Sequence, residues 1–250
     1  VVKVERHQLD MLVDLAGRRY WINDSSAKGY VLERLLAGAG VELEKQTVSG
    51  DAIRYVDWLI PGVLGMNIMF SSLFGVGYVI VRYRKNGVLK RLKATPLTAF
   101  EFLSAQVVSR LWLIVLVAML VYFGTDLFVG FRMYGSYLTL LLVLLLGTLS
   151  MISLGLIIAA RMVNEEAANG LLNLMSWPMM LLSGVWFSLD GSPAIVQQFA
   201  LLLPLTHITS AARAVMIDGA GLLDISGRLL VLLAMTALFM SIGARSFRWE

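Results

Sequence analysis

The sequence predicts an all-α membrane protein, a polytopic helical bundle that carries a small mixed α/β segment at its N-terminus. Of its 250 residues, 58% are hydrophobic and only 15% are charged, whereas about a quarter of the residues in a soluble domain are charged. One core of this size cannot bury so much apolar surface, so lipid must surround most of the chain. The composition therefore excludes an ordinary soluble enzyme.

Five stretches of the sequence are long and apolar enough to cross a bilayer, which takes roughly 20 residues. A further stretch, residues 193–218, contains Pro193 and Pro204. Prolines and polar residues interrupt a helix, so we expect two short external helices there, interfacial or re-entrant, with a break near Pro204. The five spans are expected at about residues 58–81, 107–128, 137–160, 170–189 and 225–244.

Basic residues in the short loops predict the orientation, because cytoplasmic loops carry an excess of Lys and Arg. With five spans, one side of the membrane holds about nine such residues and the other side about three. The richer side includes the connector at residues 82–106 and the C-terminus, which we therefore expect to be cytoplasmic. The nine are Arg82, Arg84, Lys85, Lys90, Arg91, Lys93, Arg161, Arg245 and Arg248, and the three are Arg132, Arg213 and Arg228.

Residues 1–57 form a polar segment ahead of a transmembrane domain at residues 58–250. The same count places this segment on the external, periplasmic or extracellular, side of the membrane. The segment has no leading Met and no apolar signal region, so we expect an upstream transmembrane helix, which brings the native total to six. Strands are expected around Gln8–Ile22, a turn at residues 23–25, and a helix from about Ser26 to Ala37. By itself this segment is too small to bury much of a core, so we expect further upstream residues or a partner chain to complete it. The helix would present Tyr30, Val31, Leu35 and Leu36.

The connector at residues 82–106 contains the densest cluster of basic residues in the chain. Gly87 breaks the helix that leaves the first span, and Pro96 stops the next short helix from continuing. We expect that short helix to lie across the membrane surface; the alternative is a solvated basic loop whose charges only set the topology. On the helix, three apolar residues share one side and three basic residues face elsewhere: Val88, Leu89 and Leu92 against Lys90, Arg91 and Lys93.

Two helix starts carry capping signals. Thr98 followed by Glu101 is the pattern of a capping box. Asn164 is the expected N-cap of the fourth span, with Glu165 and Glu166 favourable against the positive helix end. Because adjacent helical residues point about 100° apart, these two carboxylates do not form a general acid/base pair.

Small residues recur within the spans at four-residue spacing. Ser71 with Gly75 and Gly155 with Ala159 fit small-xxx-small helix contacts, and pore lining is the alternative. Asn67 is a polar group at middle depth, where a side chain prefers a protein partner or a wet cavity to lipid. We interpret it as an interhelical hydrogen-bonding group or as a polar group on a translocation path.

Signals of catalysis are missing from the sequence. The chain has no Cys, no Gly-x-Ser-x-Gly elbow and no Gly-x-x-x-x-Gly-Lys-Ser/Thr phosphate loop, and its two histidines are far apart. We therefore expect no catalytic residue, metal or cofactor in this chain. The basic residues do not share one soluble face, so a nucleic-acid partner is not expected.

Three stretches, in this order and spacing, resemble the permease subunit of type-2 ATP-binding-cassette (ABC) exporters. Residues 54–67 resemble the family's entry into its second transmembrane helix, and residues 87–97 are similar to its cytoplasmic coupling segment. The third stretch begins at residues 164–171, which resemble its fifth helix, and continues through residues 182–187 and 203–213, which resemble the external helices before the sixth. The resemblance covers about residues 54–245.

The resemblance implies that this chain holds the second to sixth helices of a permease in the bacterial inner membrane. It implies a second permease copy, membrane lipid, and separate ABC ATPase subunits that bind ATP and Mg, so the chain itself is not an enzyme. The substrate would be a hydrophobic or amphipathic drug, lipid or glycan-lipid. Residues 1–57 resemble only the subset with an enlarged external domain between helices one and two. The coupling residues would be Gly87, Val88, Leu89, Lys90, Arg91, Leu92, Lys93, Ala94, Thr95, Pro96 and Leu97.

A function without transport is the alternative. In it, the chain is a membrane anchor or assembly factor whose external domain binds a partner. A neighbouring gene for a soluble ATPase with a Walker motif would favour the exporter.

Overall fold

A computed structural model describes residues 4, 9–24, 26–38, 43–48, 54–131, 133–160, 162–189 and 191–247. The chain divides into two compact units, Val1–Val56 and Asp57–Glu250, which are described separately below. The fold class predicted from the sequence is confirmed: helices predominate, and a small three-stranded sheet lies near the N-terminus. Three of the charges that entered the orientation count, Arg132, Arg161 and Arg248, lie outside the described residues.

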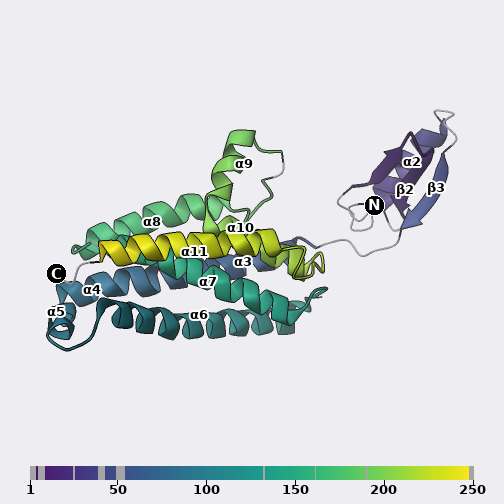
Figure 1. The fold of residues 1–250 in the computed structure, drawn as a ribbon. Helices are drawn as coiled ribbons and strands as arrows, with labels where there is room; N and C mark the ends of the chain where they lie inside the picture. The colour runs from purple at the N-terminus through teal and green to yellow at the C-terminus, as the bar shows by residue number, and fades with distance from the viewer. Residues whose placement is uncertain are drawn as a thin grey trace. The chain divides into compact units, whose positions relative to one another are not determined.

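The described part of the first unit contains a three-stranded sheet and the helix α2 (Ala27–Gly38), as Figure 1 shows. Strands β1 (Met11–Asp14) and β2 (Arg19–Asn23) pair antiparallel. Strand β3 (Glu44–Val48) pairs parallel with β2, so α2 is the crossover that a parallel pair requires. The sequence indicated the first two strands and the helix but not β3, because its residues Glu-Lys-Gln-Thr-Val are mostly polar.

A polar contact joins β2, α2 and β3. The Tyr20 hydroxyl on β2 donates a hydrogen bond to Glu33 Oε1 on α2 at 3.0 Å, and Lys45 Nζ on β3 lies 2.7 Å from the same oxygen. Tyr20 and Ile22 are buried, whereas Tyr30, Val31 and Leu35 on α2 are 56%, 56% and 66% exposed. Three of the four apolar side chains that α2 was expected to present are thus exposed, and the fourth, Leu36, is half-buried.

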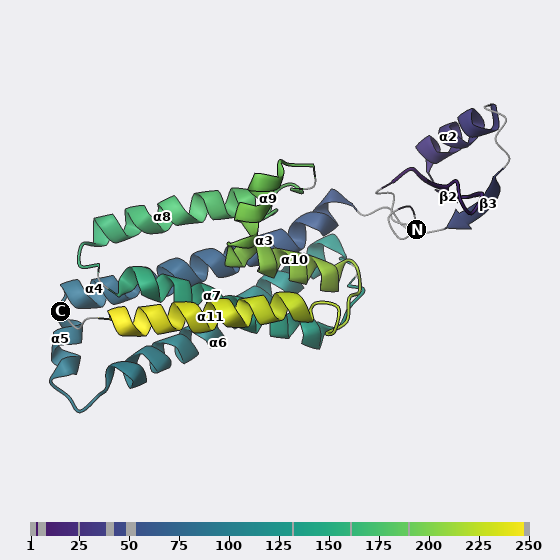
Figure 2. The same ribbon diagram turned by 45° about the horizontal axis from the view of Figure 1, so that its top comes forward.

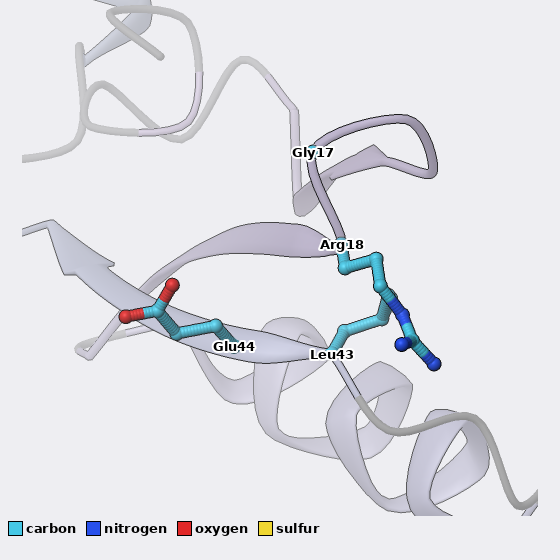
Figure 3. A pocket seen from close by; sticks show the side chains of 4 residues that line it. All are labelled: Gly17, Arg18, Leu43 and Glu44. Atoms are coloured by element: carbon cyan, nitrogen blue, oxygen red, sulfur yellow. The ribbon is translucent and has the colours of Figure 1, made fainter.

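A shallow hollow of about 340 Å³ lies beside the end of the β1–β2 turn, lined by Gly17, Arg18, Leu43 and Glu44. Arg18 has φ +48°, and its carbonyl accepts a hydrogen bond from the Glu44 N–H at 2.8 Å. Figure 3 shows the Arg18 and Glu44 side chains pointing away from each other. The hollow is therefore open and carries no paired charges at its centre.

The second unit is a helical bundle built around α7, which contacts α6, α8, α10, α11 and the π-helical segment η1. Figures 1 and 2 show α6 and α11 running alongside α7, with α5 at one end of the bundle. Its helices are α3 (Tyr55–Ser72), η1 (Leu73–Tyr78), α4 (Val79–Lys85), α5 (Val88–Lys93), α6 (Ala99–Val129), α7 (Tyr137–Ala159), α8 (Glu165–Leu182), α9 (Ala194–Leu201), α10 (Pro204–Met216) and α11 (Ser226–Ser246).

Four helical segments in the described part of the chain are long and apolar enough to cross a membrane: Tyr55–Lys85, Glu101–Val129, Tyr137–Ala159 and Ser226–Ser246. A fifth candidate is the pair α9 and α10, which bends by 93°. The break lies next to Pro204, where the sequence predicted it. Many large apolar side chains on α6 and α11 are exposed, as expected for helices bordered by lipid.

The ends of several helices differ from the expected spans. The α8 helix covers Glu165–Leu182 rather than residues 170–189, and it is not among the four apolar segments. It stops where Gly184 takes the left-handed φ of +68°, a conformation that ends helices and favours glycine. The fourth span over residues 170–189 thus stays a prediction. Helix α6 begins at Ala99, eight residues before its expected span, and its 31 residues extend about 46 Å at 1.5 Å per residue.

The first span contains a change of helix type that the sequence did not indicate. Between α3 and α4 the chain forms the π-helical segment η1, and π turns inside α-helices are frequent at functional sites. Gly77 in η1 lies close to α7, because a Cβ added there would be 3.3 Å from the Gly155 carbonyl oxygen. A Cβ at Gly75 would meet nothing within 4 Å, so the Ser71/Gly75 pair is not a contact face among the described residues.

Small residues set the close approaches to α7. A Cβ at Gly147 would lie 2.7 Å from Ile208 Cγ1 of α10, and one at Gly155 would lie 3.5 Å from Leu73 Cα of η1. A Cβ at Gly243 of α11 would lie 3.4 Å from Leu156 Cβ. The interpretation of Gly155 as a packing residue is therefore confirmed.

Substitution of Gly62 tests this close packing. A Cβ at Gly62 in α3 would lie 2.6 Å from the backbone oxygen of Val185, and backbone cannot move aside as a flexible side chain can. We expect Gly62→Ala to cost about 1–3 kcal/mol, the usual cost of overpacking, and to lower the apparent unfolding temperature in detergent. Gly124→Ala is the control, since a Cβ there meets nothing within 4 Å; equal unfolding temperatures for both variants would contradict the packing.

The Glu33 contact predicts a pH dependence of the first unit. The hydrogen bond from Lys45 lowers the pKa of the Glu33 carboxyl below its ordinary value of 4.5. The folded state then favours the ionised carboxyl, so the stabilisation is present above that value and is lost as pH falls through the lower folded pKa. We expect amide exchange in β2, α2 and β3, corrected for its intrinsic rate, to accelerate below about pH 4.5. Glu33→Gln should remove this acceleration, and an unchanged pH profile would disprove it.

Candidate functional site

The candidate site is the end of the bundle that carries α5, called the α5 end from here on. It consists of α4, α5, the start of α6, the end of α7, the start of α8 and Phe247 after α11. Figures 1 and 2 show these segments together, next to the described C-terminus. The elements come from three separate stretches of the sequence, so the fold assembles this end.

The short helix α5 forms where the sequence predicted it. Gly87 precedes it with φ +69°, which an L side chain rarely adopts, and this glycine separates α5 from α4. Leu89 is completely buried and fixes the helix on the bundle. Val88 and Leu92 are half-buried, and the basic side chains are exposed: Lys90, Arg91 and Lys93.

The segment after α5 leads directly into α6. The Thr95 hydroxyl donates a hydrogen bond to the Leu92 carbonyl at 2.6 Å, which closes the turn at the end of α5. Thr98 and Glu101 form the predicted capping box: the Glu101 N–H donates to Thr98 Oγ1 at 3.2 Å, and Glu101 Oε2 accepts from the Thr98 N–H at 2.8 Å. Local hydrogen bonds therefore hold both ends of the short segment between α5 and α6.

Arg84 in α4 joins the elements of the α5 end. Its guanidinium donates hydrogen bonds to three backbone carbonyls at and beyond the end of α7: Ala159 at 2.7 Å, Ala160 at 3.0 Å, and Met162. The guanidinium carbon also lies 5.9 Å from the ring centre of Phe247, within the range of a cation–π contact. Only 7% of this arginine is exposed.

Further contacts surround this arginine. The Phe247 ring packs at 6.2 Å, centre to centre, against Phe102 of α6. Glu165 Oε2 at the start of α8 accepts a hydrogen bond from the Tyr78 hydroxyl at 3.3 Å and lies 3.6 Å from Lys85 Nζ. Asn164 caps α8 as predicted, because its Oδ1 accepts from the Glu166 N–H at 2.9 Å. Glu165, the first residue of α8, therefore contacts both η1 and α4.

Asn67 lies away from the α5 end. It is half-buried in α3, and its Oδ1 is buried with no hydrogen-bond donor among the described residues. Eighteen residues separate it from Lys85 along one nearly continuous helical segment, which corresponds to roughly 25 Å. The structure thus keeps the two parts of the predicted site apart.

A second arginine holds the opposite part of the bundle. Arg213 of α10 donates hydrogen bonds to the Gly184 carbonyl at 2.9 Å and the Trp58 carbonyl at 3.3 Å. Its guanidinium carbon lies 3.8 Å from the centre of the Trp58 ring. The contact joins α10 to the start of α3 and to the turn after α8.

Sequence reasoning used Arg84 and Arg213 only as charges in the orientation count and missed both structural roles. The signal was a basic residue inside or beside an apolar helix, which needs polar partners. In the described part of the chain, no group of three or more His, Asp or Glu residues is arranged to hold a metal ion. The α5 end offers exposed cations on a fixed helix, an arrangement suited to binding an acidic partner.

Comparisons with known proteins place this sequence in a family. The profile of the ABC-2 type transporter family matches residues 19–217, which extends further toward the N-terminus than the resemblance noted above. The chain is 28% identical over 188 residues to the inner membrane transport permease YhhJ of Escherichia coli K12, which covers 73% of this chain and 49% of that protein.

Two further relatives show similar coverage. The probable multidrug ABC transporter permease YbhS of Escherichia coli K12 is 25% identical over 76% of this chain and 48% of its own length. The linearmycin resistance permease protein LnrN of Bacillus subtilis 168 is 26% identical over 74% of this chain and 48% of its length. The chain spans about half the length of the curated relatives it matches. Because the family profile covers most of the sequence, this multi-pass membrane protein belongs to the ABC-2 type transporter family.

Proposed function

We propose that this chain is the membrane-spanning part of the permease of an ATP-driven exporter in the bacterial inner membrane. A separate ABC ATPase binds the segment Gly87–Leu97 from the cytoplasm, and closure of the ATPase on ATP moves this segment. Two permease copies together form the path. ATP and Mg bind to the ATPase, and this chain catalyses no reaction itself.

The observation that carries the proposal is the geometry of α5. A six-residue helix is fixed to the bundle by one buried apolar side chain, Leu89, while its cations Lys90, Arg91 and Lys93 are exposed. A solvated loop that only sets topology needs no such anchor. A fixed cationic helix at one end of a bundle provides a partner with charges to bind and a lever to move.

The proposed substrate is a hydrophobic or amphipathic molecule exported from the cytoplasm. Relatives whose names refer to multidrug transport and linearmycin resistance support this class. The apolar composition of the spans is compatible with it, and Asn67, with its buried and unpartnered oxygen, is the proposed polar contact on the path. Residues 1–57 form the external segment in this arrangement.

Charge reversal on α5 tests the coupling. In the full-length permease purified with its ATPase in lipid, Arg91→Glu combined with Lys93→Glu should reduce transport-coupled ATPase activity at least tenfold, because repulsion replaces attraction to the acidic partner, which costs several kcal/mol. Leu92→Asp should have the same effect, since it puts a charge at the half-buried edge of the contact. The measurements are ATP hydrolysis with and without added ethidium, and co-purification of the ATPase.

The control for this experiment is Arg245→Glu, which reverses an exposed charge at the end of α11 outside Gly87–Leu97. It should leave coupled activity near the parental rate. All variants should insert normally, as judged by yield in the membrane fraction. Parental activity in the Arg91/Lys93 variant would contradict the coupling assignment, and a permease that never binds an ATPase would favour the membrane-anchor alternative.

A further inference from the structure

The contacts of Arg84 indicate a role that the proposed function does not assign. A cation that is only 7% exposed is costly to remove from water unless hydrogen bonds compensate it. The compensation comes from Ala159, Ala160 and Met162, whose carbonyls lie at and just after the C-terminal end of α7. Such carbonyls lack partners within their own helix and carry its partial negative charge. The guanidinium therefore binds the end of α7 firmly.

The same residue is directly connected to α5. The Arg84 carbonyl accepts a hydrogen bond from the Gly87 N–H at 3.1 Å, and α5 begins at the next residue. Any displacement of α5 therefore reaches Arg84 through three covalently linked residues. From Arg84 it reaches the central helix α7 through the hydrogen-bonded guanidinium.

Phe247 extends the connection to two more helices. Its ring lies beside the Arg84 guanidinium and packs against Phe102, so it joins the end of α11 and the start of α6 to the same point. The π-helical segment η1 directly precedes α4 in the sequence. Arg84 thus binds α4 to α7 and to Phe247, next to a segment of irregular helix.

We infer that Arg84 is a positioning residue that transmits the movement of α5 to α7. The inference rests on the proposed function, since it presumes that an ATPase moves α5. The guanidinium is required because its planar fork reaches several carbonyls at once, whereas a lysine ammonium at the same position acts as a point charge. Without the fork, α5 still moves but α7 no longer follows.

These 250 residues contain no cysteine, so single cysteines introduced into them can report each movement once any cysteine elsewhere in the full-length permease is replaced by serine. Ala94→Cys labels the end of α5, and Val163→Cys labels the exposed link after α7. Each is labelled with bimane in the full-length permease, reconstituted in lipid with its ATPase. The emission change on adding ATP and Mg is measured in parental and Arg84→Gln backgrounds. The expected result is an unchanged response at position 94 and at least a fivefold smaller response at position 163.

Two backgrounds separate transmission from general damage. Arg245→Gln removes an exposed arginine at the same end and should leave both responses at the parental level. Arg84→Lys keeps a cation for one carbonyl and should reduce the ratio of the response at position 163 to that at position 94. If Arg84→Gln does not insert or fold, this ratio in Arg84→Lys decides the inference.

The outcomes distinguish the inference from the proposed function. Equal ratios in the parental, Arg84→Gln and Arg84→Lys backgrounds overturn the role of Arg84 and leave the proposed function intact. A parental protein that shows no ATP response at position 94 overturns the proposed function and the inference with it. A selective loss at position 163 supports both.

Discussion

The close packing of α7 against its neighbours is the constraint on which the bundle depends. Lipid tails are as apolar as the side chains, so no hydrophobic force drives helices together inside a membrane, and contact between well-fitting surfaces must do it. An added Cβ at Gly147 would clash with Ile208 of α10, and one at Gly155 or Gly243 would already be in van der Waals contact with η1 or α7. Because these neighbours all pack on one helix, its position determines theirs.

Arginine side chains fix the parts of the bundle that packing alone leaves loose. Arg84 and Arg213 each bind main-chain carbonyls of other elements and stack on an aromatic ring. Helix ends and turns are where carbonyls lack partners, and a guanidinium satisfies several of them together. The helices are thus connected near both ends by groups that resist separation, while η1 interrupts the regular α-helix between α3 and α4.

This arrangement suits a membrane protein that must transmit movement. A rigid contact at Arg84 and an irregular helix at η1 lie within one continuous segment, Tyr55–Lys85. Packed interfaces change between discrete arrangements more readily than they deform gradually. A displacement at the α5 end can therefore reorient whole helices, which is the kind of change that the proposed export mechanism needs.

The sequence by itself determined the elements whose causes are local. Apolar composition predicted a helical membrane bundle, Gly87 and Pro96 bounded α5, Thr98 with Glu101 capped α6, and Asn164 capped α8. These features depend on residues within a few positions of one another, where propensity and hydrogen bonding act directly. The polar strand β3 and the π segment η1 were not predicted, since strand pairing and helix type there depend on neighbours distant in the sequence. The early end of α8 was also not predicted, although its cause, the conformation of Gly184, is local.

The tertiary structure alone decided which residues meet. Nothing near Arg84 in the sequence indicates that its partners are the carbonyls of Ala159, Ala160 and Met162, and the same holds for Arg213 with Gly184 and Trp58. Backbone carbonyls have no residue type, so a contact to them leaves no pattern to read in a single sequence. Only the packing of α4 beside the end of α7 brings that donor and those acceptors within hydrogen-bond distance, because geometry rather than composition selects the partner.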